Sequence, residues 1–310
     1  MSSLDTSLPQ LAQKWGGEYR SIDLDGPVAY IDFGGPSDAV PFVLVHGLGG
    51  MALNYVLLAP YLREAGYRVY AVDLAGHGLT RAVERSSSVR NNAKLVRQFI
   101  EEVLGEPAVV AGNSMGGLIV SMLASTHPDA VRGVVLLNPA MPAPRRYPGR
   151  QLASLRSLIT PAARGVVGKA RKRPITPEAE IEHTMRLCFA DWTIRDQEMF
   201  DAHVDMAKAR RRFPEALAAL GVAARTMFQE TIAHRAVMDR YHRIKAPVLL
   251  IHGTHDRLVD IEAARWAKKG NPRWLYAEWD DTGHVPMMEH PERTAKTMLS
   301  WVESHGILAA

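Results

Sequence analysis

The chain has 310 residues, 47% of them hydrophobic and 23% charged, and its 37 Lys and Arg against 33 Asp and Glu give a net charge of +4. This composition is ordinary for a globular protein, excludes a low-complexity or fibrous chain, and allows either one large domain or a domain that carries an insertion. The single cysteine, Cys188, excludes an internal disulfide, and with no secretory signal and no apolar run long enough to span a bilayer we expect a cytoplasmic protein.

Strand patterns alternate with helix patterns over the first 140 residues. Two short strands are expected within residues 19–33, joined by a turn at 25–27. Buried strands follow at 41–46, 67–73, 107–112 and 131–137, with helices at 55–65, 88–104 and from 115 to about 127. Strands that alternate with helices in this way predict a mostly parallel sheet with helices on both faces.

Residues 141–245 interrupt the alternation. They show helical stretches at about 151–169, 177–190, 196–212 and 215–238, and the alternation resumes with strands at 246–252 and 273–279 and helices from 261 and from 291. The insertion carries 20 Lys and Arg against 11 Asp and Glu, whereas the rest of the chain is net acidic. We therefore expect a core domain of residues 1–140 and 246–310, and an all-helical cap of residues 141–245 over the strand ends, where ligands bind in open α/β sheets.

The most informative motif is Gly112-Asn-Ser-Met-Gly116, which joins a predicted strand directly to a predicted helix. A serine with glycines two residues before and two residues after it is the pattern of a nucleophile elbow. The turn is so sharp that side chains at the glycine positions would collide with the neighbouring strand and helix. The pattern also arises by chance in a chain with 24 glycines, but its place between strand and helix favours Ser114 as a nucleophile.

Two later loops contain the partners that such a serine needs. Asp256 lies just after the strand that ends at His252, where a carboxylate can orient an imidazole. His284 lies in a Gly-His loop after the last strand and is the predicted general base. Taken separately, each is equally well read as an ordinary loop aspartate or surface histidine. Both follow a strand, however, and together they predict a Ser114–His284–Asp256 triad.

A tetrahedral intermediate needs two donors aimed at its oxyanion, and backbone N–H groups serve without side-chain specificity. Met115, just after the predicted nucleophile, should provide one N–H group. Leu48, in the glycine-rich loop of residues 46–50, should provide the other. His46 and His77 are expected to be structural residues that bond loop backbone.

Five motifs together resemble the successive signatures of the α/β-hydrolase family. They are His46-Gly-Leu-Gly49, Asp73-Leu-Ala-Gly-His-Gly78, Gly112-Asn-Ser-Met-Gly-Gly117, Gly253-Thr-His-Asp256 and Gly283-His-Val-Pro-Met-Met-Glu-His-Pro291. The chain order of serine, aspartate and histidine matches that fold. The likeness covers residues 40–140 and 246–305 and scarcely the cap. It points to the esterase, lipase and meta-cleavage C–C hydrolase branch, because a serine in the elbow argues against epoxide hydrolases and haloalkane dehalogenases.

The resemblance implies a serine hydrolase, of the carboxylesterase or lipase type, that cleaves carboxylic esters by two-step acyl transfer without a metal or an organic cofactor. The expected small-molecule substrate is an ester with an apolar acyl group or a lipid-like ester. One alternative is a C–C hydrolase of a vinylogous diketone, which uses the same triad and usually has a polar pocket for the substrate's carboxylate. A third reading is a binding protein that keeps the fold without turnover, which a complete triad disfavours.

The basic charge of the cap allows one further hypothesis. The runs at 164–174 and 210–213 most often form a solvated face, but they could attract an anionic substrate or an anionic membrane surface. No nucleic-acid recognition motif accompanies the charge, so we expect no nucleic-acid partner.

Overall fold

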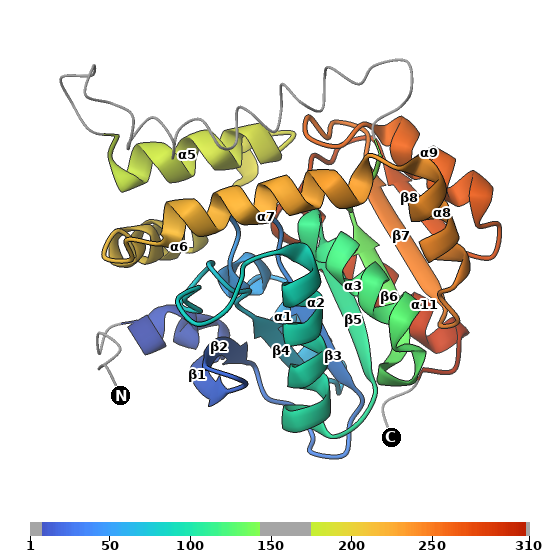
Figure 1. Cartoon of the computed structure of the whole chain (residues 1–310), viewed down its shortest axis with the longest axis horizontal. Helices are drawn as coiled ribbons and strands as arrows, with labels where there is room; N and C mark the ends of the chain where they lie inside the picture. Colours follow the sequence, from blue (N-terminus) through green and yellow to red (C-terminus); the bar gives the residue numbers. More distant parts are fainter. Residues whose placement is uncertain (1–7, 143–174, 308–310) are drawn as a thin grey trace.

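The structure, a computed structural model, describes residues 8–142 and 175–307 and is built on an eight-stranded sheet (Figure 1). The strand order is β1-β2-β4-β3-β5-β6-β7-β8; β2 is antiparallel to both of its neighbours, and the other pairs are parallel. The strands are β1 (Glu18–Asp23), β2 (Pro27–Asp32), β3 (Pro41–Val45), β4 (Arg68–Val72), β5 (Ala108–Asn113), β6 (Val131–Leu137), β7 (Val248–Gly253) and β8 (Leu275–Trp279). The predicted mostly parallel sheet is confirmed.

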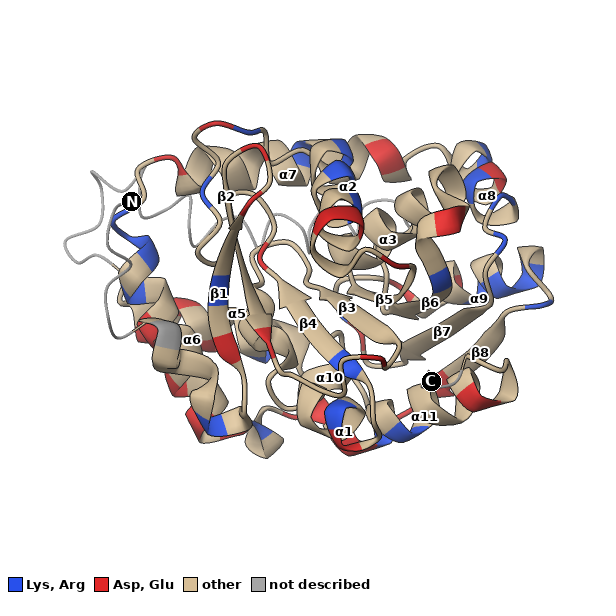
Figure 2. Ribbon diagram, turned by 90° about the horizontal axis from the view of Figure 1, so that it is seen from below, with Lys and Arg blue, Asp and Glu red and all other residues tan. Residues whose placement is uncertain are grey.

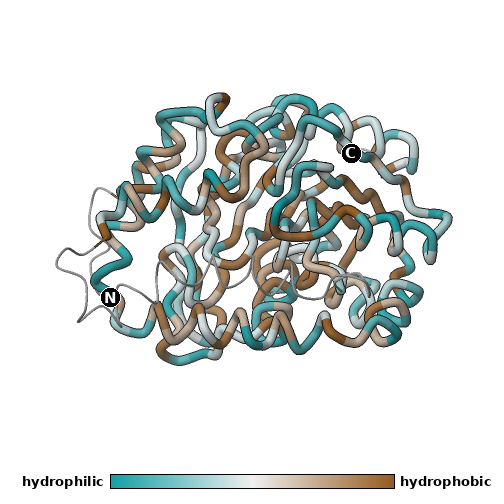
Figure 3. The backbone as a smooth tube through the Cα atoms, turned by 90° about the horizontal axis from the view of Figure 1, so that it is seen from above, coloured by the Kyte–Doolittle hydropathy of each residue, from teal (hydrophilic) through white to brown (hydrophobic). Residues whose placement is uncertain are grey.

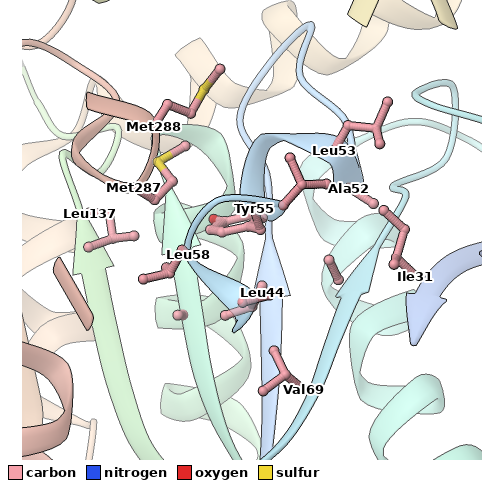
Figure 4. Packing of buried hydrophobic residues seen from close by; sticks show 14 of the residues in the cluster. Ile31, Leu44, Ala52, Leu53, Tyr55, Leu58, Val69, Leu137, Met287 and Met288 are labelled. Atoms are coloured by element: carbon pink, nitrogen blue, oxygen red, sulfur yellow. The ribbon is translucent and has the colours of Figure 1, made fainter. Parts of the chain in front are cut away.

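Both faces of the sheet are buried. Successive strand residues point to opposite sides, so alternate residues of one strand pack into two different clusters. Phe42 and Leu44 belong to one apolar cluster, whereas Val43 and Val45 belong to the other. The helices over the first cluster are α1 (Ala59–Glu64), α10 (Pro286–Glu289) and α11 (Pro291–Ser304), and those over the second are α2 (Val89–Gln98), α3 (Met115–Thr126) and α9 (Ile261–Gly270). Figure 4 shows part of the first cluster, where Leu58 packs near Leu44.

Polar residues lie at the periphery of this arrangement. The charged side chains colour mainly the outer helices and loops, while the central strands carry few of them (Figure 2). The hydropathy of the backbone follows the same division, with apolar residues concentrated in the strands at the centre (Figure 3). Strands covered on both faces are expected to be continuous apolar runs of this kind.

The expected helix at 55–65 is wrong as a single element. A 3-10 turn, η2 (Ala52–Tyr55), precedes the short helix α1, and Pro60 lies in the first turn of α1. A proline is tolerated there because the N–H group that it lacks has no intrahelical partner, whereas inside a continuous helix it would remove a hydrogen bond. The proline therefore decides where this helix begins.

Other helices differ from expectation at their ends. The helix expected at 88–104 consists of α2, capped by the Ser88 hydroxyl, and a π-helical turn, η3 (Phe99–Leu104), which ends at Gly105 with a φ of 69°. The pattern at 215–238 forms two helices, α7 (Ala216–Thr231) and α8 (His234–His242). The remaining short turns are η1 (Leu8–Trp15), η4 (Pro128–Ala130) and η5 (Trp192–Ile194).

The insertion between β6 and β7 is helical in residues 175–245, where the structure describes it. The helices α5 (Pro177–Cys188), α6 (Gln197–Arg210) and α7 lie together above the sheet in Figure 1. The helix α8 instead packs on α3 and contributes Val237 and Tyr241 to the core cluster. We propose that the cap ends before His234, earlier than the predicted boundary at 245. The expected helix at 151–169 lies outside the described residues.

The basic segments predicted in the cap are only partly described. The run at 164–174 lies outside the described residues. On α6, the Arg210 guanidinium donates hydrogen bonds to the carbonyls of Gly76, at 2.7 Å, and Gly78, at 3.3 Å. Arg210 thus joins α6 of the cap to the core loop that contains Gly76 and Gly78 by hydrogen bonds. Among the described helices, none is long and apolar enough to cross a membrane.

Candidate active site

Ser114 lies at the turn between β5 and α3, in a strained backbone conformation. Its φ of 53° and ψ of −118° lie outside the regions that residues with a side chain normally adopt. The turn is held from both sides, because the Ser114 N–H donates to the Leu137 carbonyl at 3.1 Å and the Ser114 carbonyl accepts from Ala140 at 2.8 Å. Ser114 is partly exposed, whereas Asn113 and Met115 are buried. This is the geometry of the predicted elbow.

The glycines of the motif are required by close backbone contacts. A Cβ atom on Gly112 would lie 2.3 Å from the Gly116 carbonyl oxygen, and one on Gly116 would lie 2.0 Å from the Val45 carbonyl oxygen. Neither contact can be relieved by moving a flexible side chain, because both neighbours are backbone atoms. The spacing in the sequence thus reflects how tightly α3 packs against β3 and β5.

We expect the substitution Gly116→Ala to lower the free energy of unfolding by about 3 kcal/mol, because its methyl group would overlap the backbone of β3. The matched control is Gly221→Ala in α7, where a Cβ meets no atom within 4 Å and removal of a helical glycine should stabilise by roughly 0.5–1 kcal/mol. Denaturant unfolding measures both. A Gly116→Ala protein as stable as the control would contradict this account.

His284 and Asp256 are joined by a hydrogen bond. The Nδ1 atom of His284 lies 2.8 Å from Asp256 Oδ2, and since a carboxylate only accepts, Nδ1 carries the proton. His284 is buried and, with Ser114, lines one pocket. The Ser114 hydroxyl makes no hydrogen bond with a described residue, and catalytic contacts are often this loose before substrate binds. The structure therefore places the three predicted residues at one site and joins two of them directly.

The Asp256 carboxylate is fully enclosed and held in one orientation. Its Oδ1 atom accepts from the N–H groups of Leu258, at 2.7 Å, and Val259, at 3.0 Å. Burial by itself raises the pKa of this carboxyl, but His284, His252 and the backbone donors outweigh burial and hold the pKa below its usual value. Asp256 is thus a fixed negative charge beside the His284 ring.

Asn138 supports this pair and was not identified from the sequence. Its amide nitrogen donates to Asp256 Oδ2 at 2.8 Å and to the Gly283 carbonyl at 3.0 Å, so it joins the loop of Asp256 to the loop of His284. It is buried, with a φ of 44°, directly after β6. The signal was available, because Asn138 follows a predicted strand at the same sheet edge as Ser114 and Asp256.

The loop that carries His284 is also held by the cap. The His284 N–H donates to the carbonyl of Cys188, the last residue of α5, at 2.6 Å. The buried carboxylate of Glu289 accepts from Gly283, at 3.0 Å, and from Ala190 in the cap, at 2.7 Å. Burial raises the pKa of Glu289 even though these backbone donors lower it. The position of the His284 ring thus depends on contacts from both the core and the cap.

The two predicted oxyanion donors have N–H groups that remain available. Neither the Leu48 nor the Met115 N–H donates a hydrogen bond to a residue in the described ranges. Met115 is the first residue of α3, where helical N–H groups have no intrahelical partner and the helix end attracts negative charge. Leu48 lines the same pocket as Ser114.

The polar residues around the glycine-rich loop are structural. His46 Nδ1 donates to the Gly47 carbonyl at 2.8 Å, and its Nε2 accepts from Leu74 at 3.1 Å, as expected of a residue that bonds loop backbone. Asp73 accepts from the N–H groups of Ala52 and Leu79, and burial raises its pKa to about 6. These bonds fix the loop that contains Leu48.

The pocket beside Ser114 is mostly apolar and is closed on one side by the cap. Cap residues and core residues both contribute apolar side chains to it: Leu48, Met51, Ile181, Met185, Cys188, Phe189, Leu258, Val285 and Met288. None of the described lining residues is Lys, Arg, Asp or Glu. Within the described ranges, no group of His, Cys, Asp and Glu residues could hold a metal ion.

Comparisons with known proteins agree with this arrangement. The model of the alpha/beta hydrolase fold matches residues 40–291. The pimeloyl-[acyl-carrier protein] methyl ester esterase of Aromatoleum aromaticum is 32% identical over 82% of this chain and 94% of its own. The monoacylglycerol lipase ABHD6 of Homo sapiens is 24% identical over 87% of this chain and 77% of its own. The crystal structure of a membrane phospholipase A superposes with a TM-score of 0.75 at 25% identity, over 97% of this chain and 89% of that one. The chain belongs to the alpha/beta hydrolase family.

Proposed function

We propose that the protein is a serine hydrolase that cleaves carboxylic esters, with Ser114 as nucleophile, His284 as general base and Asp256 as the residue that orients His284. The observation that carries the proposal is the placement of a strained, partly exposed serine and a bonded histidine–aspartate pair on one apolar pocket. The names of the relatives, a methyl ester esterase and a monoacylglycerol lipase, support ester bonds as the target.

The reaction has two steps. His284 Nε2 takes the hydroxyl proton of Ser114 as its oxygen attacks the ester carbonyl, and Asp256 stabilises the imidazolium that forms. The N–H groups of Leu48 and Met115 stabilise the oxyanion. His284 then gives its proton to the leaving alcohol and activates a water molecule, which releases the acid and restores Ser114.

The pocket favours an apolar ester over the substrate of a C–C hydrolase. A meta-cleavage substrate carries a carboxylate, whose burial costs several kcal/mol unless a cation or several donors meet it. Since the described lining includes no Lys or Arg, that cost has no evident compensation here. Apolar acyl groups need no such partner, and their transfer from water to contact with the methionine and leucine side chains makes binding more favourable.

The proposal is tested with p-nitrophenyl butyrate and a fluorophosphonate, which reacts with activated serines. We expect hydrolysis of the ester, complete inactivation by one equivalent of the inhibitor, and a labelled peptide that contains Ser114. Heat-unfolded protein is the control, and it should remain unlabelled because activation of Ser114 requires the folded site. Label on another residue, or full turnover after labelling is complete, would be inconsistent with the proposal.

A further inference from the structure

Two polar side chains meet in the wall of the pocket, and whether a hydrogen bond joins them depends on which nitrogen of His203 carries the proton. His203, on α6 of the cap, is 4% exposed, and Asn54 lies in η2 of the core. Both line the pocket that contains Ser114. The Nε2 atom of His203 lies 3.3 Å from the Oδ1 atom of Asn54.

The proton of the neutral His203 ring is on the other nitrogen. Nδ1 lies 2.7 Å from the Met199 carbonyl oxygen, which can only accept, so Nδ1 is the donor. Burial lowers the pKa of His203 to about 4, in spite of the bond to Met199, and the ring is therefore neutral near pH 7. A neutral imidazole has one N–H group, so Nε2 offers only a lone pair.

The atom that faces Nε2 is also an acceptor. The Met51 N–H donates to Asn54 Oδ1 at 3.0 Å, and turning the amide over would place two donors against each other. The Asn54 side chain therefore keeps its oxygen toward His203. Two lone pairs face each other at 3.3 Å, and within the described ranges no other hydrogen bond is made to His203 Nε2.

We propose that Asn54 and His203 bind a hydroxyl group of the substrate, so that the enzyme prefers esters that carry a free hydroxyl. The proposal rests on the ester hydrolase function proposed above. A hydroxyl hydrogen between the two acceptors removes their repulsion, whereas an ether or a carboxylate would add a further acceptor. Thr184, another polar residue of this cap wall, donates its hydroxyl hydrogen to the Glu180 carbonyl at 3.0 Å and serves as the control in the test below.

In a mostly apolar pocket a single such bond should have a large effect on specificity. Sites that are built to bond a hydroxyl discriminate strongly against analogues that lack it, because the buried polar atoms of the site then remain unpaired. The hydroxyl can belong to the acyl part or to the alcohol part of the ester, since both parts occupy the pocket around Ser114. The experiment distinguishes the two.

The test compares kcat/KM for two series of esters. The acyl series is ethyl 3-hydroxybutyrate, ethyl 3-methoxybutyrate and ethyl butyrate; the alcohol series is 2-hydroxyethyl butyrate, 2-methoxyethyl butyrate and propyl butyrate. We expect the hydroxy ester of one series to exceed its methoxy partner by about tenfold or more. The series that shows the preference identifies the part of the substrate that carries the hydroxyl.

Two variants connect the preference to the structure. In His203→Leu the hydroxy-to-methoxy ratio should fall to about one. In the matched control Thr184→Val, which removes another polar group of the same wall, the ratio should remain as in the wild type. Because each ratio is measured within one protein, a general loss of activity does not alter it.

Calorimetric binding of the same esters to the Ser114→Ala protein separates this proposal from the proposed function. A binding preference for a hydroxy ester supports the hydroxyl site even if the wild type hydrolyses no ester. The proposal is overturned if hydroxy and methoxy esters are turned over and bound equally well, or if the wild-type preference persists in His203→Leu. Hydrolysis of all six esters at similar rates would leave the ester hydrolase function intact and remove the hydroxyl site.

Discussion

In the Ser114→Ala protein, kcat/KM for p-nitrophenyl butyrate is expected to fall by about 10⁴-fold or more, because no other group can form the acyl-enzyme. The residual activity reflects binding and the oxyanion donors alone. The fold should be retained, since the Ser114 hydroxyl makes no hydrogen bond with a described residue and alanine keeps the same backbone and Cβ atom. Steady-state kinetics and circular dichroism measure the two effects. Retained activity in a folded Ser114→Ala protein would reject Ser114 as the nucleophile.

The variant Ser114→Gly serves as the matched control for backbone strain. It should be as inactive as Ser114→Ala, but its free energy of unfolding should equal or exceed that of the alanine protein. A φ of 53° with a ψ of −118° costs a residue with a side chain roughly 1–3 kcal/mol, whereas glycine adopts it freely. The larger entropy of glycine in the unfolded chain offsets up to about 1 kcal/mol of that gain. A glycine variant clearly less stable than the alanine variant would show that the elbow is not strained.

The sequence predicted those parts of the molecule in which local pattern and tertiary contact agree. The buried strands are continuous apolar runs. The elbow requires its glycines, because backbone atoms lie only 2.0–2.3 Å from where a Cβ atom on Gly112 or Gly116 would be. The predicted proximity of Asp256 and His284 rests on a similar pattern, because both follow strands whose ends share one sheet edge, and the structure joins the two side chains by a hydrogen bond. The expected helix at 55–65 is wrong because the apolar pattern continues across Pro60, whereas this proline lies in the first turn of α1 and fixes where the helix starts.

The remainder depends on contacts that the sequence does not show. The pairing of His203 with Asn54 joins residues 149 positions apart, and that of Asn138 with Asp256 joins residues 118 positions apart. Neither His203 nor Asn138 belongs to a motif with fixed spacing, and the role of each depends on the side-chain atom that it presents to its partner. The composition of the pocket wall depends on such contacts, since side chains on α5 and α6 line the pocket beside residues of the core.

Asp256→Asn is expected to lower kcat/KM by about 10⁴-fold, because the substitution imposes the wrong tautomer on His284 and also places a donor opposite the Asn138 amide nitrogen, which donates to Oδ2 in the wild type. The N–H groups of Leu258 and Val259 require an oxygen at the Oδ1 position, so the new amide nitrogen occupies the place of Oδ2. That nitrogen donates to His284 Nδ1, which must then accept, and the ring proton moves to Nε2. With Nε2 already protonated, the ring cannot take the proton of Ser114.

The matched control for this substitution is Asp260→Asn. It removes the same charge four residues further along the chain, where the Asp260 carboxylate caps α9 by accepting from Glu262 at 3.0 Å. Asparagine caps a helix about as well as aspartate, so both stability and activity should be unchanged. Equal activity losses in the two variants would indicate an effect of charge rather than of the His284 tautomer.

The wild type and the Asp256→Asn protein should also differ in how their stability depends on pH. A carboxyl whose pKa is lower in the folded state contributes stability that is complete above its unfolded pKa of about 3.9 and disappears as the pH falls through the folded value. For Asp256 the interactions with His284, His252 and the backbone donors outweigh the opposing effect of burial and lower the pKa. The free-energy advantage of the wild type over Asp256→Asn should therefore shrink as the pH falls below about 4, as denaturant unfolding at each pH would show. An advantage that grew as the pH fell from about 5 to about 3 would mean that burial dominates and that Asp256 is protonated more easily in the folded protein, which is incompatible with a fixed negative charge beside His284.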